Sequence, residues 1–258
     1  MTATLRTARQ GFGQTSRRDA WWVEPALVGI GFGAFIVYSI FSAFFWKPLF
    51  GVGYEADGYL SPFFSPLIGE GLLPAWLSPA ILILWIPLGF RTTCYYYRKA
   101  YYRAYFADPP ACAVGEPRIH GRYRLETALP FILQNLHRFF LYLAFIPLFF
   151  LWLDAILSLR DGGQWRIGLG GALLSVNVVL LTGYSLSCHS LRHLVGGKLD
   201  CFSCSARDRT RHAAWKRLSA LNERHLAWAW SSLISVALAD LYVRLLAAGL
   251  FADPALRL

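Results

Sequence analysis

Residues 25–46 read PALVGIGFGAFIVYSIFSAFFW, without one charged side chain. As a helix, such a stretch is long enough to cross the roughly 30 Å of hydrocarbon in a bilayer. Four more segments have a similar length and apolar character, at about 76–97, 129–153, 167–191 and 226–250. The sequence therefore predicts an all-α integral membrane protein, a bundle of five transmembrane helices that forms one domain over residues 1–258.

The composition supports a membrane protein. The chain is 56% hydrophobic and only 16% charged, whereas soluble domains carry about a quarter charged residues. The first twenty residues are polar and basic, so we expect no signal peptide. The net charge of +10 could suggest a nucleic-acid partner. We reject that interpretation, because membrane proteins concentrate Lys and Arg on their cytoplasmic side.

The distribution of basic residues predicts the orientation in the plasma membrane. Lys and Arg are frequent in the N-terminal tail and in the segments of about 98–128 and 192–225, and segment 50–75 has none. Basic loops mark the cytoplasmic side. We therefore expect a multi-pass protein with a cytoplasmic N-terminus, an outside C-terminus and an ordered external loop at 50–75. No internal repeat is evident.

The cysteines and histidines all fall near the predicted cytoplasmic face. None lies in the outer half of a predicted span, and this clustering indicates a redox or metal site at the inner surface. They are Cys94, Cys112, His120, His137, Cys188, His189, His193, Cys201, Cys204, His212 and His225.

The end of the fourth span has the spacing of a metal site. His189 and His193 are four residues apart on a helix and share one face, and Cys201 and Cys204 form a C-x-x-C motif. Zinc accepts two Cys and two His, as does a Rieske-type [2Fe–2S] cluster. Cys188 could replace one of the two loop cysteines, Cys94 could be an additional ligand, and the motif could also hold no metal. We expect no disulfide, because cytoplasmic thiols stay reduced.

Haem is the alternative use of the histidines. A bis-histidine haem needs imidazoles that face each other from different helices. His137 on the third span, His189 or His193 on the fourth and His225 on the fifth could supply them. One inner haem b fits this arrangement, whereas two haems stacked across the membrane do not.

Three stretches resemble the membrane anchor (cytochrome b-type) subunit of succinate dehydrogenase and fumarate reductase, in its actinobacterial branch. They are RTTCYYYRKAYYRAYFADPPACAV at 91–114, LQNLHRFFLY at 133–142 and SLSCHSLRHLVGGKLDC at 185–201. The resemblance implies an anchor that docks an iron–sulfur subunit on its cytoplasmic face, with a flavoprotein subunit that oxidises succinate. It also implies electron transfer to menaquinone. Five-helix anchors of this family usually carry two haems on four helix histidines, and this sequence departs from that pattern.

A quinone site is expected beside the inner centre, in an apolar cleft with a few hydrogen-bond donors. The candidates on the second, third and fifth spans are Gln134, His137, Arg138, Tyr95, Arg98 and Trp228. The alternative is structural, because Tyr and Trp at this depth form the aromatic belt and Arg near a span end reaches to the interface.

Three ionisable residues lie in the outer third of the spans: Asp154, Asp240 and Arg244. Asp240 and Arg244 are one helical turn apart and can pair. We expect a hydrated pair near the surface, with a proton route to an outer quinone site as the alternative.

Two other functions compete with the succinate dehydrogenase anchor. One is a stand-alone membrane protein with a structural zinc hairpin, and the other is a b-type haem anchor of another dehydrogenase. The chain has no Ser–His–Asp set, P-loop or dinucleotide fingerprint. We therefore expect no succinate chemistry in this chain itself.

Overall fold

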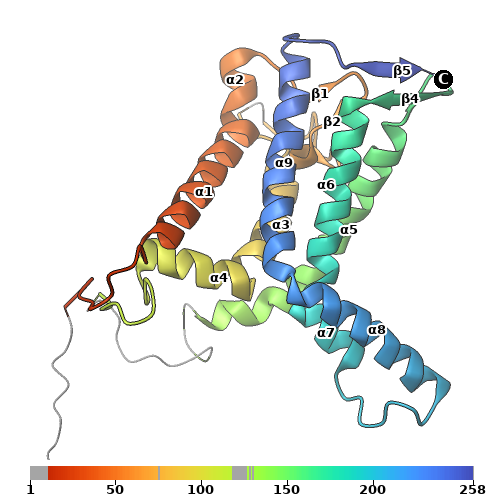
Figure 1. Ribbon diagram of the computed structural model, residues 1–258. Coiled ribbons are helices and arrows are strands. Elements are labelled where there is room, and N and C mark those ends of the chain that lie inside the picture. Colours follow the sequence, from red (N-terminus) through yellow and green to blue (C-terminus); the bar gives the residue numbers. More distant parts are fainter. Residues whose placement is uncertain (1–10, 75, 118–126, 128, 130, 258) are drawn as a thin grey trace, which may run out of the picture.

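The computed structural model describes residues 11–74, 76–117, 127, 129 and 131–257. Its main body is a bundle of long helices that run roughly side by side (Figure 1). They are α1 (Val23–Ile40), continued by η1 (Phe41–Phe45) and α2 (Trp46–Phe50), then α3 (Ile81–Thr92), α5 (His137–Leu157), α6 (Leu169–Leu186) and α9 (His225–Ala247). The predicted all-helical membrane architecture is thus confirmed.

Four helical segments in the described part of the chain are long and apolar enough to cross a membrane. They are Val23–Phe50, Ile132–Leu157, Leu169–Leu186 and His225–Ala247. The predicted span at 76–97 is represented by α3, which has only 12 residues. At 1.5 Å per residue such a helix covers about 18 Å, less than the hydrocarbon thickness. Judged by helix length, the described residues form four full-length spans, so the predicted five are not confirmed.

The segment before α3 is not one continuous helix. It contains the hairpin of β1 (Glu55–Ala56) and β2 (Tyr59–Leu60), then the short η2 helix (Pro62–Phe64). Phe63 and Phe64 are buried in one apolar cluster with Tyr54, Ala43 and Ala80. The described part of the predicted loop, residues 50–74, is therefore ordered, as expected, and packs against the bundle.

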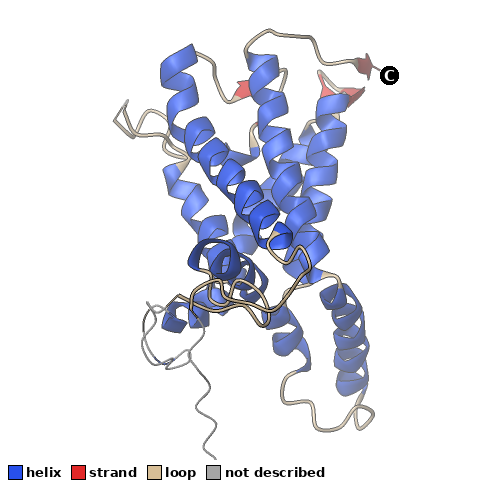
Figure 2. Cartoon of the chain, turned by 60° about the vertical axis from the view of Figure 1, so that its left-hand side comes forward, coloured by secondary structure: helices blue, strands red, loops and turns tan. Residues whose placement is uncertain are grey.

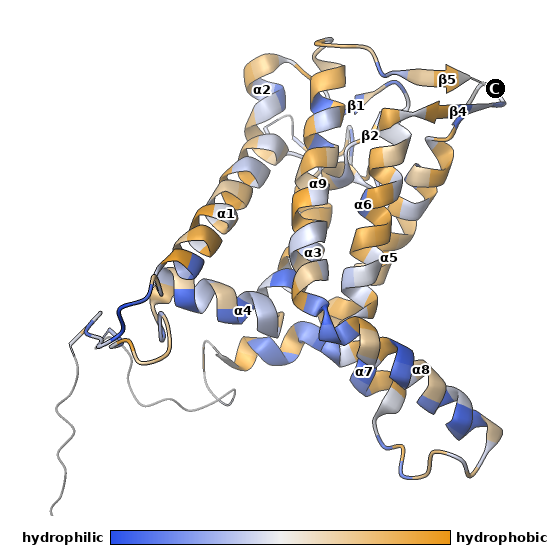
Figure 3. Cartoon of the chain, viewed as in Figure 1, coloured by the Kyte–Doolittle hydropathy of each residue, from blue (hydrophilic) through white to orange (hydrophobic). Residues whose placement is uncertain are grey.

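Shorter helices gather at one end of the bundle, which we call the basic end. They are α4 (Tyr95–Tyr101) with η3 (Tyr102–Phe106), η5 (Phe131–Leu136), α7 (His189–Gly196) and α8 (Ala206–Glu223). Helices α7 and α8 form a hairpin that projects from the bundle (Figure 2), and α8 is strongly hydrophilic (Figure 3). This end carries the basic segments of the sequence, including Lys99, Arg192 and Arg217.

The other end is closed by a small antiparallel sheet and the C-terminal tail. Strands β3 (Arg160–Asp161), β4 (Gln164–Gly168) and β5 (Ala255–Arg257) pair in that order. The start of α1 and the C-terminus lie at opposite ends of the bundle (Figure 1). Asp253 holds the tail in place: it pairs with Arg166 at 3.0 Å and accepts hydrogen bonds from Tyr59 and Tyr242.

The predicted pair on the last span forms, but its predicted hydration is wrong. Arg244 Nε lies 3.5 Å from Asp240 Oδ1, and neither side chain has any exposed surface. Hydroxyl groups of Tyr38, Ser42 and Ser61 donate to the Asp240 carboxylate. The pair is buried because the loop before α3 folds over it.

Candidate functional site

Two helix breaks at the basic end position two cysteines. Helix α3 ends at Thr92 and α4 begins at Tyr95, while α6 ends at Leu186 and α7 begins at His189. Cys94 and Cys188 occupy the breaks with extended backbones, at ψ 131° and 133°. Both side chains are buried, at 2% and 1% exposure. The backbone change at each break turns a thiol into the bundle.

Two histidines meet these cysteines. His137 Nε2 lies 3.2 Å from Cys188 Sγ, and His225 Nε2 lies 3.5 Å from Cys94 Sγ. The residue before each cysteine holds the opposite histidine: Thr93 Oγ1 is 3.0 Å from His137 Nδ1. In the same way, Ser187 Oγ is 2.6 Å from His225 Nδ1. Each helix break therefore contacts both histidines, one through a hydroxyl and one through a thiol.

This crossed arrangement reflects a short internal repeat that the sequence analysis missed. Residues 89–94 read GFRTTC and residues 183–188 read GYSLSC, while residues 137–140 read HRFF and 225–228 read HLAW. The aromatic ring after each glycine stacks on one histidine, with centroid distances of 4.8 Å for Phe90–His137 and 5.1 Å for Tyr184–His225. The two halves of the site use equivalent residues in equivalent contacts.

The glycines of the repeat allow the helices to approach. A Cβ at Gly89 would lie 2.1 Å from the ring of Phe140, and a Cβ at Gly183 would lie 2.4 Å from the ring of Trp228. Phe140 and Trp228 each follow a site histidine by three residues. Any larger residue at these glycines would push away the helix that carries the histidine.

The ligand set predicted from the sequence does not form a comparable cluster of histidine–cysteine contacts among the described residues. The rings of His189 and His193 are 4.8 Å apart on α7, and Cys201 is joined to Cys204 by a disulfide that we did not expect. Within the described residues, no three His, Cys, Asp or Glu side chains are arranged to hold a single metal ion. The predicted set of His189, His193, Cys201 and Cys204 stays a prediction. His120 lies outside the described residues.

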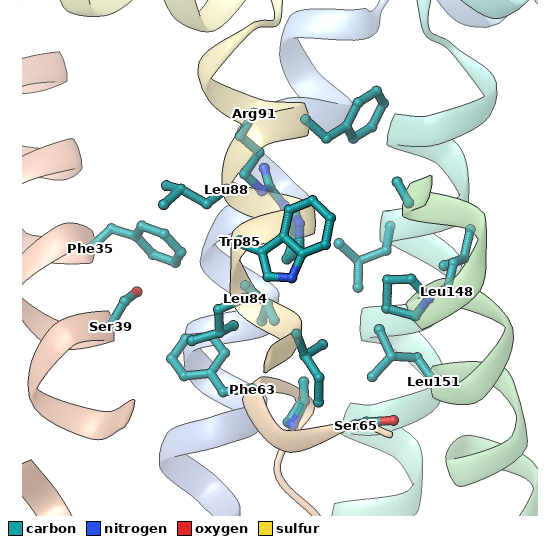
Figure 4. A pocket seen from close by; sticks show the side chains of 18 of the residues that line it. Phe35, Ser39, Phe63, Ser65, Leu84, Trp85, Leu88, Arg91, Leu148 and Leu151 are labelled. Carbon is teal, nitrogen blue, oxygen red and sulfur yellow. The ribbon is translucent and has the colours of Figure 1, made fainter. Parts of the chain in front are cut away.

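A cavity of about 400 Å³ lies between α1, α3, α5 and α6. Its lining is almost entirely apolar, as Figure 4 shows with Phe35, Trp85 and Leu148 among the labelled side chains. Leu88 on its rim is 61% exposed on the membrane-facing surface of the bundle. The cavity can therefore take up a long apolar molecule from the bilayer.

One end of this cavity borders the cysteine–histidine site. Phe90 and Tyr184 line the cavity, and the same two rings stack on His137 and His225. Their centroids are 5.2 Å apart. Arg91 and Ser185, the next residues in the two copies of the repeat, also line the cavity. A molecule in this end of the cavity would be separated from the histidines by a wall one aromatic ring thick.

The six predicted quinone-binding residues lie elsewhere, because none of them lines this cavity. His137 belongs to the cysteine–histidine site, while Gln134 Nε2 donates to Tyr101 Oη at 3.5 Å. Arg98 lies over the exposed ring of Tyr95, 5.1 Å from its centroid. Arg138 is exposed, and Trp228 packs against Gly183.

Sequence reasoning missed Phe90, Arg91 and Tyr184. The available signal was the repeat of a glycine, an aromatic residue and a hydroxyl–cysteine pair at the end of two predicted spans. The ligands predicted from the sequence are close together along the chain, whereas the structure brings together residues at the same depth on different helices.

The comparisons with known proteins agree with this architecture. Residues 23–249 match the family described as the actinobacterial succinate dehydrogenase subunit SdhC. The fold is similar to a chain of the Mycobacterium smegmatis Sdh1 complex in the apo form, with a TM-score of 0.83 and 39% sequence identity. That match covers 97% of this chain and 96% of the other. No curated protein sequence matches.

Both matches extend over most of the chain, and the residues matched by the family include all four of the cysteine–histidine site. The chain belongs to the actinobacterial SdhC family, and is therefore a multi-pass plasma-membrane subunit of a succinate dehydrogenase, a succinate:quinone oxidoreductase.

Proposed function

We propose that this subunit passes electrons from a docked iron–sulfur subunit to menaquinone, and that Cys94, His137, Cys188 and His225 hold a Rieske-type [2Fe–2S] cluster on the way. The observation that carries the proposal is the convergence of two buried thiols and two imidazoles at one end of the bundle. The residue types and their number match a Rieske centre, in which two Cys bind one iron and two His bind the other.

The surroundings of the histidines favour their role as ligands. Both present Nε2 toward a cysteine sulfur, and both have Nδ1 against a hydroxyl oxygen. Metal-binding histidines usually donate the N–H of their other nitrogen to such a partner, which fixes the tautomer and the ring orientation. Thr93 and Ser187 can therefore orient the two imidazoles.

The contacts among the four side chains also explain why no single-metal site is found among the residues that the structure describes. Each cysteine contacts one histidine, so the four side chains form two pairs and not one tetrahedral set. A Rieske-type cluster takes both cysteines on one iron and both histidines on the other, so binding it would require each cysteine to separate from the histidine that it contacts here. When bound, such a cluster supplies one-electron transfer.

The apolar cavity is the proposed place for the quinone. Its volume of about 400 Å³ falls in the range of small-molecule pockets. We place the head group at the end lined by Phe90, Arg91 and Tyr184, next to the proposed cluster, with the isoprenoid tail toward Trp85 and Leu88. The Arg91 guanidinium and the Ser185 hydroxyl are polar groups in this end of the cavity.

The basic end is the proposed docking surface for the iron–sulfur subunit, with the flavoprotein beyond it. Helix α8 carries Arg207, Arg209 and Lys216 on a hairpin that projects from the bundle. Basic residues mark the cytoplasmic side of membrane proteins. The proposed orientation therefore places the N-terminus inside, the C-terminus outside and the cysteine–histidine site near the cytoplasmic face.

Low-temperature EPR of the dithionite-reduced, purified complex, together with iron, zinc and acid-labile sulfide assays, tests the cluster. We expect a histidine-ligated [2Fe–2S] signal that is lost in His137→Ala and His225→Ala. His212→Ala is the matched control and should keep the signal. The His212 ring stacks on Phe202 in the α7–α8 hairpin and is not one of the four proposed ligands.

The other outcomes are distinct. Loss of the signal in His189→Ala or Cys201→Ala, with His137→Ala unaffected, would favour the ligand set predicted from the sequence. A b-type haem absorbance band without labile sulfide would replace the cluster with a haem, and stoichiometric zinc without iron would exclude an electron-transfer role for the site.

A further inference from the structure

Arg91 breaks the symmetry of the repeat around the cysteine–histidine site. It stands three residues before Cys94, and the equivalent residue three before Cys188 is Ser185. The neighbouring positions keep their character, with Gly89 matching Gly183 and Phe90 matching Tyr184. One half of the site therefore contains a permanent positive charge that the other half lacks.

The guanidinium of Arg91 points into the bundle and is held by neutral groups. Its Nη1 donates to Tyr97 Oη and to the carbonyl of Ala229, and its Nη2 donates to Ser232 Oγ at 3.1 Å. Tyr97 and Ser232 are themselves buried. In the part of the chain that the structure describes, no carboxylate forms an ion pair with Arg91.

Arg91 is half-buried, and its lack of a carboxylate partner contrasts with the two buried cations among the described residues of the bundle. Arg244 pairs with Asp240, and Arg166 pairs with Asp253. An unpaired charge inside a membrane domain costs several kcal/mol. A negative group near such a cation would offset this cost.

The position of Arg91 indicates which group that is. Its guanidinium carbon lies 4.8 Å from the centroid of Tyr184, and the same ring is 5.1 Å from that of His225. Cys94 follows Arg91 by three residues, in the break between α3 and α4. The two thiolates of a bound cluster would place negative charge close to the Tyr184 ring that Arg91 contacts.

We propose that Arg91 is the fixed counter-charge of the cysteine–histidine centre, and that it raises the reduction potential of the group held there. The inference rests on the proposed function. Accepting one electron from the iron–sulfur subunit makes the centre more negative by one unit, and passing that electron to the quinone removes this charge. A permanent cation nearby stabilises the reduced state relative to the oxidised one.

A potentiometric titration followed by EPR measures this effect directly in the intact complex. Arg91→Gln should lower the equilibrium constant for reduction of the centre about tenfold, which lowers the reduction potential by about 59 mV for a one-electron couple. Arg91→Lys keeps the charge and should keep most of the potential. Lys47→Gln removes one charge from α2, at the end of the bundle opposite α4 (Figure 1), and is the control that should leave the potential unchanged.

A second pair of variants tests the same idea with the arginine in place. Ser232→Asp puts a carboxylate against Arg91 Nη2 and neutralises its charge, whereas Ser232→Asn is nearly the same size and neutral. We expect Ser232→Asp to lower the potential and Ser232→Asn to leave it close to that of the natural protein. This pair decides the question where Arg91→Gln fails to assemble.

The outcomes separate the two proposals. If the unmodified complex shows no cluster signal, the proposed function fails. If the signal is present and its potential is the same in Arg91→Gln, or in both Ser232 variants, then the role of Arg91 is wrong and the cluster proposal stands. A lower potential in both Arg91→Lys and Arg91→Gln would also overturn it, because loss of shape and not of charge would then be the cause.

Discussion

Asp240 Oδ1 and Arg244 Nε lie 3.5 Å apart on successive turns of α9, and both side chains are fully buried. The pair joins three segments that are distant in sequence. Arg244 donates to the backbone carbonyls of Ser42 and Gly53, while Ser61 donates to Asp240. The interaction therefore connects α9 to η1 and to the loop that precedes α3.

Removing one partner of this pair should be severely destabilising. Arg244→Met leaves the Asp240 carboxylate buried without its cation, and breaking a buried pair in this way costs about 3–5 kcal/mol. We expect a lower thermal midpoint for the detergent-solubilised complex. The double variant Asp240→Asn/Arg244→Met should recover part of the loss, because it leaves no uncompensated charge; an equal or larger loss would show that the hydrogen bonds matter more than the charge.

The contacts of Asp253 with Arg166, Tyr59 and Tyr242 should make the thermal midpoint depend on pH in the acid range. Burial raises the pKa of Asp253, but hydrogen bonds from Tyr242, Tyr59, the Gly170 N–H and Arg166 outweigh this effect and leave the pKa below its ordinary 3.8. Burial raises the pKa of Tyr59 to about 12, so Tyr59 remains a neutral donor throughout. The contribution of the ionised carboxylate is therefore present above about pH 4 and lost as the pH falls through the lowered pKa.

Asp253→Asn should accordingly lower the thermal midpoint at neutral pH. The difference in thermal midpoint between the variant and the natural protein should become smaller as the pH falls below about 4. Hydrogen bonds to a charged group contribute about 1.5–3 kcal/mol each, so the loss at neutral pH should be easily measured. Asp57→Asn is the matched control, since that side chain is exposed at the same end of the bundle. A difference that persists unchanged at acid pH would contradict the assignment.

Gly183 should not tolerate even a methyl group. A Cβ there would lie 2.4 Å from the Trp228 ring, and overpacking of this kind costs about 1–3 kcal/mol. Gly183→Ala should reduce the thermal midpoint, and adding Trp228→Leu should restore part of it. Gly33→Ala on α1 is the control: its Cβ would meet only the Tyr105 hydroxyl, at 3.5 Å, and alanine favours the helix.

Filling the apolar cavity should block quinone reduction without affecting succinate oxidation. Ala144 is buried and lines the cavity, so Ala144→Trp would occupy part of it. We expect the rate with a quinone to fall at least about tenfold, while the rate with an artificial acceptor that takes electrons from the soluble subunits stays the same. Phe145→Trp, on the exposed side of the same helix, should change neither rate.

Much of the bundle could be predicted from hydrophobicity alone. The spans at 25–46, 129–153, 167–191 and 226–250 correspond to long helices within a few residues at most boundaries. The predicted second span, at 76–97, differs because hydropathy does not separate a helix from a loop of similar hydrophobicity. Residues 76–80 read WLSPA and carry no charge, yet α3 begins only at Ile81.

The site was harder to predict than the fold. The concentration of Cys and His at one end followed from their depth in each span, and the structure places Cys94, His137, Cys188 and His225 together at that end. Their pairing depends on how each helix is rotated about its axis, which hydropathy does not specify. The helix breaks at Cys94 and Cys188 decide that rotation, and neither break contains proline or glycine as a warning.

The four side chains of the site come from four separate passages of the chain: the break after α3, the start of α5, the break after α6 and the start of α9. A group bound by all four would act as a cross-link between helices that are made at different times during synthesis. Insertion of that group would then be a late step of membrane biogenesis, completed only when the last helix is in place.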